Sequence, residues 1–529
     1  MAAHAKSPCD VGVIQSTPHV ASAGSSAPWI LAATILGSSM VFVDGTAVNV
    51  ALPALQLDLK ATIAEVIWVV ESYALLLAAL LLAAGAAGDR FGRRKVFAIG
   101  TALFALASIW CGLAQSALEL IMARALQGVG GALLVPNSLA IISASFDGTE
   151  RGKAIGTWSG ATAITAAIGP VLGGWLVDQV SWRAVFFINV PLAVVILALT
   201  FWRMPESRNE AEEGPLDWQG AALATLGLGG LVYALIEAPQ RGWTNPYIVA
   251  GLLLGVVLLI AFVLVEERVR EPMLPLKLFK SRTFTGANIL TFLLYGALGG
   301  GLFFLPLNLI QVQGYSATAA GAAILPFILL IFALSRTAGG LAAVYGNRLP
   351  LVVGPVIAGL GFALLALPSV GGSYWLTVFP GVTVLGLGMS VAVAPLTTTV
   401  MSSVESAYAG TASGINNAAS RVAALVAVAL FGVVMSVGFN ASLDRALAGA
   451  KLSPAAVQSM ATQREKLAAI ELPAGIDAES RATAQRAVAE AFVFGYRWVM
   501  VISALLGLAS GVIAAFTIDP GVQKRQGIS

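Results

Sequence analysis

The chain has 529 residues, of which 58% are hydrophobic and only 11% are charged, and its formal net charge at pH 7 is +3. One helix needs about 20 apolar residues to cross the hydrocarbon layer of a bilayer, and apolar runs of this length recur from end to end. This composition excludes a soluble globular protein and a β-barrel with its short alternating strands, gives no sign of a nucleic-acid partner, and predicts an all-α polytopic membrane protein.

The N-terminal segment, residues 1–28, is rich in Ala, Ser and Pro and lacks the charged and apolar regions of a signal peptide. We expect it to be a disordered cytoplasmic tail. Both histidines, His4 and His19, lie in this tail, so carboxylates must carry any proton inside the membrane. The only cysteines, Cys9 and Cys111, predict neither a disulfide nor a metal site.

Apolar runs between charged, proline or glycine punctuation predict fourteen membrane helices. Their approximate ranges are 30–51, 66–87, 96–114, 118–144, 154–178, 183–202, 217–237, 246–265, 284–309, 318–343, 350–369, 376–400, 408–437 and 492–516. We interpret them as an N-terminal six-helix bundle (29–203), an inserted helix pair with cytoplasmic linkers (204–282), five helices of a C-terminal bundle (283–437), an extracytoplasmic loop (438–490) and a last helix with a cytoplasmic tail (491–529).

Lysine and arginine predict the orientation of these helices. With fourteen spans, one side of the membrane receives the basic clusters at 89–95, 150–153, 203–208, 266–282 and 523–525. The short loops of the other side hold only Lys60, Arg183 and Arg241. Basic residues collect on the cytoplasmic side, so we expect an inner-membrane protein with both termini in the cytoplasm. In the long outer loop, Ser453-Pro454 and Asp477 are typical helix starts and predict short amphipathic helices.

One internal repeat is visible. The stretch "GAAGDRFGRR" (85–94) aligns without a gap with "GGLAAVYGNR" (339–348), and each follows the second helix of a six-helix set. Asp89 and Arg90 are replaced in the second copy by Ala343 and Val344. Repeated halves around a site at mid-membrane are the architecture of secondary transporters.

Several motifs resemble those of the major facilitator superfamily. The stretch "GAAGDRFGRRK" resembles the loop between its second and third helices, "LIMARALQGVGGA" (120–132) its helix-four motif, and "TAAIGPVLGG" (165–174) its antiporter motif, with Thr165 where that motif usually has glycine. "VDGTAVNVALP" (43–53), "WRAVFFINVP" (182–191) and "LDWQG" (216–220) resemble the fourteen-helix drug:proton antiporter branch. The resemblance implies two six-helix bundles with two inserted helices, and multidrug efflux.

Asp44 and Arg124 are charged residues within apolar runs. A charged side chain facing lipid at mid-bilayer costs about 3 kcal/mol or more, so Asp44 must face a cavity or a partner. Arg124 lies at a similar depth, counted at 1.5 Å per residue. We expect the pair to couple protons to transport; alternatively Asp44 only joins two helices and Arg124 only positions one. Glu71 is a second proton or cation site, or else an interfacial residue that reaches outer water.

The charged loop at 85–94 predicts a cytoplasmic gate. Asp89 would bind helix dipoles or an arginine across the two halves when the pump faces outward, and would release them when it faces inward. The alternative is anchoring by positive charge alone. The gate residues are Gly85, Asp89, Arg90, Gly92, Arg93 and Arg94, and the glycines permit a tight turn.

The antiporter motif contributes Gly169, Pro170, Gly173 and Gly174 on the fifth helix. Small residues let membrane helices pack closely and proline kinks a helix, so the motif is either a seal between the halves that blocks proton leak or simple packing. A substrate cavity is expected to include Trp68, Tyr73, Tyr295, Asn416 and Asn417, although such residues also serve structural packing.

No nucleotide-binding, hydrolase, zinc or redox motif is present in the sequence. We therefore expect no enzyme activity, no cofactor and no metal, with the proton gradient as the energy source. The expected partners are a small amphipathic, often cationic substrate, protons and the lipid bilayer; a periplasmic adaptor is not specified. The leading hypothesis is proton-driven drug export by alternating access. The alternatives are a dedicated exporter of one metabolite, fatty acid or siderophore, and a non-transporting membrane sensor.

Overall fold

The structure is a computed structural model that describes residues 26–146, 148–208, 217–269, 272, 274–405, 408–449, 454–473 and 476–519. Fourteen of its helices are long and apolar enough to cross a membrane, which confirms the predicted number of spans. The expected N-terminal tail lies almost entirely outside the described residues. The α-helices are α2 (Ala27–Asp58), α3 (Ile63–Phe91), α4 (Arg93–Leu113), α5 (Ala117–Ser145), α6 (Gly148–Gln179), α7 (Ala184–Phe187), α8 (Asn189–Arg203), α9 (Trp218–Arg241), α10 (Pro246–Arg268), α11 (Arg282–Leu307), α12 (Ala317–Ala322), α13 (Leu325–Tyr345), α14 (Arg348–Leu365), α15 (Tyr374–Thr377), α16 (Phe379–Ser402), α17 (Ala409–Gly449), α18 (Pro454–Thr462) and α19 (Ala478–Thr517).

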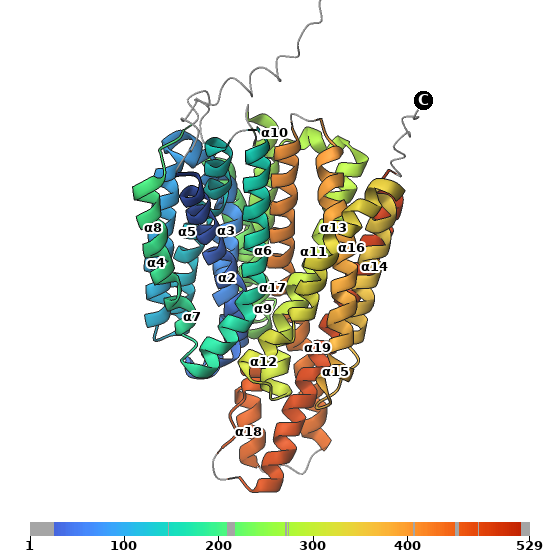
Figure 1. The fold of residues 1–529 in the computed structure, drawn as a ribbon. Coiled ribbons are helices and arrows are strands. Elements are labelled where there is room, and N and C mark those ends of the chain that lie inside the picture. The colour runs from blue at the N-terminus through green and yellow to red at the C-terminus, as the bar shows by residue number, and fades with distance from the viewer. Residues whose placement is uncertain are drawn as a thin grey trace, which may run out of the picture.

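The helices form two bundles that stand side by side (Figure 1). The N-half consists of α2 to α8, and the C-half consists of α11 to α17 together with α19. Because α2 begins and α19 ends at the same end of the molecule, we call this the tail end, and the opposite end the cap end. A short 3-10 helix, Leu276–Lys280, precedes α11, and a π-helical turn, Asn308–Val312, follows it.

The repeated loop has the same backbone form in both halves. Gly92 ends α3 with φ +107°, and Gly346 ends α13 with φ +82°. Positive φ strains any residue with a Cβ, so glycine permits the sharp turn into the next helix at both places. A Cβ at Gly92 would also press on the Glu206 carboxyl group, at 2.7 Å.

The segment 438–490 holds more helix than the apolar runs predicted. The helix predicted at 408–437 runs on to Gly449, and the helix predicted at 492–516 already begins at Ala478. These extensions are polar and leave the apolar runs, so hydropathy does not signal them. With α18 and the 3-10 helix Arg464–Ala469 they form a cap beyond the membrane-spanning bundle (Figure 1), and buried side chains hold it together, including Leu443, Met460, Leu467 and Ala484.

Two predicted starts of helices in this cap are confirmed. α18 begins at Pro454. Asp477 is the N-cap of α19 and accepts a hydrogen bond from the backbone N–H of Ser480 at 2.8 Å. These backbone hydrogen bonds favour the ionised carboxylate and lower the pKa of Asp477.

The inserted pair, α9 and α10, occupies one seam between the halves. The two helices pack closely because Gly230, Gly251 and Gly255 face one another: a Cβ at Gly255 would meet the backbone of Gly227 and Leu231 at under 3 Å. α9 contacts α3 of the N-half and α17 of the C-half. The pair therefore covers the α3–α17 seam from outside, whereas no helix in the described part of the chain covers the other seam, between α6 and α13, in this way.

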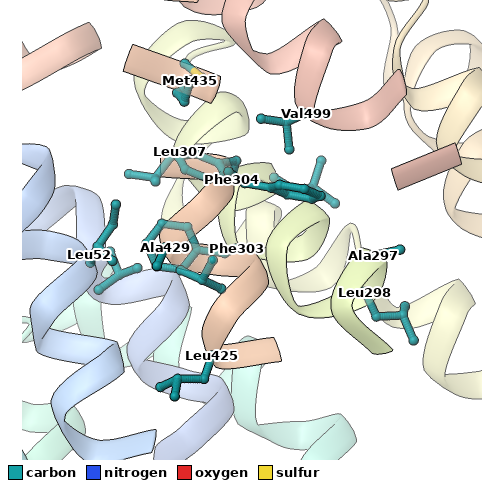
Figure 2. Close-up of a cluster of buried hydrophobic side chains, with 14 of the residues drawn as sticks. Leu52, Ala297, Leu298, Phe303, Phe304, Leu307, Leu425, Ala429, Met435 and Val499 are labelled. Atoms are coloured by element: carbon teal, nitrogen blue, oxygen red, sulfur yellow. The ribbon is translucent and has the colours of Figure 1, made fainter. Parts of the chain in front are cut away.

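An apolar core joins the halves toward the cap end. Figure 2 shows Leu52 of α2 beside Ala429 of α17 and Phe303 of α11, with Phe304 and Leu307 close by. All five side chains are buried. This dry contact fills the space between the halves at that level.

Candidate functional site

A buried ion pair lies at the centre of the N-half. Arg124 Nη1 of α5 donates to Asp44 Oδ2 of α2 at 2.5 Å, and both residues are 1% exposed. The sequence-based pairing of these two residues is therefore confirmed as geometry. A second donor of Arg124, Nε, binds the Val69 carbonyl oxygen at 3.1 Å. Buried charges are tolerated when they are paired and hydrogen-bonded in this way.

Three uncharged polar residues complete the network. Gln127 Nε2 and Asn189 Nδ2 donate to Asp44 Oδ1 at 2.9 and 3.0 Å, and both amides also donate to Ser108 Oγ, at 2.9 and 3.3 Å. All three are 0% exposed. Sequence reasoning missed them, although Gln127 lies one helical turn after Arg124 and therefore on its face. Asn189 lies in a quoted family motif, but nothing in the sequence shows that it faces Asp44.

Close packing of α5 positions Arg124. A Cβ at Gly128 would press on the Tyr73 backbone of α3, and one at Gly130 would meet the Phe104 backbone of α4 at 2.7 Å. Glycine at these positions thus lets α5 fit between α3 and α4. The Tyr73 ring then lies 4.1 Å from the Arg124 guanidinium carbon, which adds a cation–π contact. Tyr73 accordingly belongs to this buried network rather than to an open cavity.

Glu71 also lies inside the protein. It is 1% exposed, and its Oε2 atom has no hydrogen-bond partner among the described residues. Among the described residues, Glu71 forms no hydrogen bond with Asp44. Because Glu71 is buried, it also does not reach the water outside the membrane. Nearby on α3, Trp68 donates from Nε1 to Glu237 Oε1 of α9 at 3.1 Å, so this predicted cavity residue contacts the inserted pair.

The predicted gate residues gather at the tail end within the N-half. Asp89 pairs with Arg93 one turn later, at 2.7 Å. The backbone N–H of Arg93 donates to Ser207 O at 2.9 Å, and that of Arg94 to Glu206 Oε1 at 3.0 Å. Gly85 packs beside Pro136, and Arg90 lies over the Phe91 ring. The loop is thus braced by the segment after α8.

The antiporter motif lies where α6 meets α2 and α12. A Cβ at Gly169 would overlap Thr46, and one at Gly173 would meet Ala47 at 2.7 Å, both on α2. A Cβ at Gly174 would overlap the Ala317 carbonyl of the C-half, and the Pro170 carbonyl lies against Gly321 of the same short helix. The two halves therefore touch backbone to backbone here.

Hydrogen bonds reinforce this closure at the cap end. Asp178 of α6 accepts from the backbone N–H groups of Ala317 and Thr318, at 3.0 and 2.8 Å, and from Thr318 Oγ1 at 2.6 Å. Its negative charge caps the start of α12. Gln311 donates to Gln56 Oε1 at 2.8 Å, and Gln56 donates to Lys466 O at 3.2 Å.

The tail-ward part of α6 is different. A Cβ added at Gly152, Gly156 or Gly160 would meet nothing within 4 Å. The halves are thus closed against each other at the cap end, whereas α6 has open space beside it toward the tail end.

A cavity of about 350 Å³ lies below the closure, between the halves. Its wall comes from α2, α6, α11, α13 and the residue before α13: Thr46, Asn49, Val50, Ala163, Ala166, Pro170, Leu302, Pro306, Ile324, Phe327, Ile328 and Ile331. The five residues predicted for a substrate cavity are not among them. Asn416 donates to Thr291 Oγ1 at 2.6 Å within the C-half, exposed Asn417 accepts from Arg421, and Tyr295 packs on the core.

Curated relatives of this chain include named resistance proteins. It is 36% identical over 415 residues to the multidrug resistance protein Stp of Mycobacterium tuberculosis (strain CDC 1551 / Oshkosh), covering 78% of this chain and 77% of that protein. It is 32% identical over 498 residues to the tetracenomycin C resistance and export protein of Streptomyces glaucescens, covering 93% and 91%.

The fold also matches a solved transporter. A bacterial homolog of the human lysosomal transporter Spinster, in an inward-facing and occupied conformation, aligns with a TM-score of 0.64 over 92% of this chain and 96% of that one, at 16% identity. Residues 34–222 and 218–428 match the family model of the Major Facilitator Superfamily. With fourteen spanning helices, repeated halves and these matches, the chain belongs to the Major Facilitator Superfamily.

Proposed function

We propose that this protein exports drugs or other toxic amphipathic compounds from the cytoplasm in exchange for protons. The named relatives support the export of drugs, since they are multidrug and antibiotic resistance proteins. Coupling to protons must be explained from the chain's own residues. An exporter of this superfamily needs an ion gradient to move a substrate uphill.

The observation that carries the proposal is the position of Asp44 on α2. One face of α2 places Asp44 in the buried network with Arg124, and another face places Thr46, Asn49 and Val50 in the cavity wall. A change at Asp44 therefore acts on the same rigid helix that contacts the substrate. Protonation would neutralise Asp44, break its ion pair with Arg124 and leave α2 free to shift against α5.

The proposed transport cycle starts from the closure of the two halves at the cap end. With the tail end placed in the cytoplasm, this arrangement would be an inward-facing state, in which Asp44 binds Arg124. This is the state expected after the proton has left, when a substrate can bind from the inside. Opening of the cap end would then release the substrate outward and admit a proton to Asp44, with Glu71 as a second acceptor.

The same proposal includes the setting of the protein. It lies in the cytoplasmic membrane with both termini inside, uses no cofactor or metal, and performs no covalent chemistry. Its partners are small amphipathic substrates, protons and lipid. Asp89, which is bound to Arg93 in the inward-facing state, would leave that pair and contact the C-half when the tail end closes.

The test is substrate-dependent proton movement. Purified protein in liposomes, with a pH-sensitive dye inside, receives puromycin or tetracenomycin C, the compounds named by two relatives. Addition of a transported compound should drive protons in the opposite direction, and an imposed pH gradient should drive uphill accumulation. Substrate flux with no proton flux would leave an exporter of another kind, and no flux of either would contradict the proposal.

A further inference from the structure

The cavity between the halves has a wall with little polarity. Of its twelve lining residues only Thr46 and Asn49 carry polar side chains, and none is charged. A volume of about 350 Å³ is within the range of small-molecule sites, which are mostly apolar with a few polar groups. Removing a charged group from water into such a site costs several kcal/mol unless an opposite charge receives it.

One hydrogen bond orients the amide of Asn49. Its Nδ2 atom donates to the Gly45 carbonyl at 3.4 Å, one turn earlier on α2. Its Oδ1 atom is buried and has no hydrogen-bond partner among the described residues. Asn49 lines the cavity, so a ligand donor reaches this oxygen once a side chain that covers it shifts. An unsatisfied buried acceptor is costly, and a ligand N–H or O–H would satisfy it.

The Thr46 hydroxyl offers less to a ligand. Its Oγ1 donates to the Phe42 and Val43 carbonyls of the same helix, at 3.0 and 3.1 Å. Its proton is therefore used within the helix, so Thr46 can only accept from a ligand. Asn49 Oδ1 is the buried acceptor of the wall that has no partner among the described residues. Both polar groups of the chamber therefore favour a ligand that donates a hydrogen bond.

The cavity also lies beside the α6–α13 seam, which no other helix of the described residues covers. Ala163 of α6, in its wall, is exposed, and Ile328 and Phe327 of α13 face it from the other half. In a membrane this seam borders the hydrocarbon layer, whereas α9 lies over the α3–α17 seam. A compound dissolved in the bilayer therefore has a short route into the chamber.

From this geometry we infer that the cavity binds uncharged, membrane-soluble compounds that present one hydrogen-bond donor to Asn49. This rests on the proposed function and narrows it, because the general expectation for such a pump includes cationic compounds. Cations would have to bind elsewhere or bind weakly. Selectivity would come from Asn49, not from a carboxylate.

Binding is tested without transport, by protection of a cysteine in the wall. An Ala166→Cys variant in membranes is treated with N-ethylmaleimide, and the background from Cys9 and Cys111 is measured in the parent protein. The probes are N-phenyl-1-naphthylamine, which is neutral and has one N–H, its N-methyl derivative, which has none, and the cation ethidium. We expect strong protection by the first, at least five-fold weaker protection by the second, and none by ethidium.

The matched variant is Asn49→Leu in the same background. It should reduce protection by N-phenyl-1-naphthylamine to the level of the N-methyl derivative and leave the latter unchanged. Equal protection by both neutral probes before and after the substitution, or better protection by ethidium, would overturn the inference. Ala163→Trp, which fills the chamber, should abolish protection by both neutral probes; persistent protection would also overturn the inference. Because none of these measurements requires flux, their outcome is independent of proton-coupled export.

Discussion

At the scale of single residues, Asp44 of α2 binds donors from two other helices, α5 and α8. It receives one charged donor, Arg124, and two amide donors, Gln127 and Asn189. Oδ2 accepts from Arg124 and Oδ1 accepts from both amides. Under the proposed function, protonation of Asp44 would weaken these contacts, so it would be coupled to movement of α2 against α5 and α8.

Replacement of Asp44 tests this link. Asp44→Asn should abolish pH-driven uphill export, because Asn keeps the size and one acceptor oxygen but cannot titrate, while substrate binding persists. Asp44→Glu, which keeps the acid but moves it by one methylene, should retain partial coupling. The measurement is accumulation in vesicles under an imposed pH gradient, and full uphill transport by the Asn variant would make Glu71 the main candidate.

Stability needs its own control in that experiment. Removing one member of a buried ion pair costs about 3–5 kcal/mol, since the other charge is left unpaired. The double variant Asp44→Asn, Arg124→Gln removes both charges and should recover thermal stability in detergent, yet remain uncoupled. Recovery of coupling in the double variant would assign Asp44 a structural role only.

The sequence predicted this pair but not its surroundings. A charged side chain is costly in an apolar helix unless an opposite charge pairs with it. Asp44 and Arg124 lie at a similar depth, so they could be matched from the sequence. Gln127, Asn189 and Ser108 cost less to bury, so nothing in their local sequence demands a particular partner. Which helix face they occupy depends on close packing of α5 at Gly128 and Gly130, which only the folded chain reveals.

At the scale of elements, α6 and α12 form the closure at the cap end. Gly174 and Gly321 belong to opposite halves, and each touches backbone across the boundary. The contact exists only while the cap end is closed. Substitutions there should act on the balance between conformations more than on folding.

A pair of alanine variants distinguishes this closure from ordinary helix packing. Gly174→Ala should disfavour the closed cap end by about 1–3 kcal/mol, the usual cost of overpacking, which corresponds to about 5- to 150-fold in the ratio of states. Gly156→Ala on the same helix, where a Cβ meets nothing within 4 Å, should leave the ratio unchanged. Spin labels at exposed Val180 and Leu376 report the cap-end distance, and an equal response of both variants would refute this role.

Asp178 should hold the same closure by charge. Asp178→Ala removes three hydrogen bonds between the halves and should lengthen the Val180–Leu376 distance. Asp58→Ala is its matched control, since Asp58 is also at the cap end but pairs with Arg183 and Trp182 of its own half. High salt should weaken the contact, because Asp178 is exposed. A shift with Asp58→Ala as large as with Asp178→Ala would contradict the assignment.

Sequence could not reveal the Asp178 contact, although the acid is plainly visible at the end of a predicted helix. Its partners lie 139 and 140 positions away, at the start of α12. The apolar runs predict α12 and α13 as a single helix. Acidic residues are common at the ends of membrane helices, where the chain meets water, so Asp178 alone does not indicate a partner. Only the approach of the two halves makes it a cap for α12.

At the scale of the whole molecule, the sequence predicted the plan of the fold well. Fourteen apolar runs gave fourteen helices, because a bilayer requires each span to be continuous and apolar. The repeat at Gly92 and Gly346 marked the two halves. The cap escaped prediction because helices outside the membrane pack by local amphipathic faces, and hydropathy averaged over a span does not detect these.

Orientation is the prediction that belongs to this scale. A cysteine at Ser207, at the tail end, should react with an impermeant maleimide only from the cytoplasm, and one at Ser480, in the cap, only from outside. The reason is the excess of lysine and arginine at the tail end. An odd number of predicted spans separates the two positions, so they should lie on opposite sides of the membrane. Reaction of both positions from the same side would contradict the count of fourteen spans.

The seam covered by α9 has a mechanical consequence. Because α9 contacts α3 on one half and α17 on the other, opening that side would separate α9 from one of its two partners, whereas no helix among the described residues bridges the α6–α13 side in this way. We therefore expect any rocking of the halves to turn about an axis near α9, with a displacement that grows with distance from it. The antiporter motif and the apolar chamber lie at the other seam, where we expect a small rotation to produce the largest change in width.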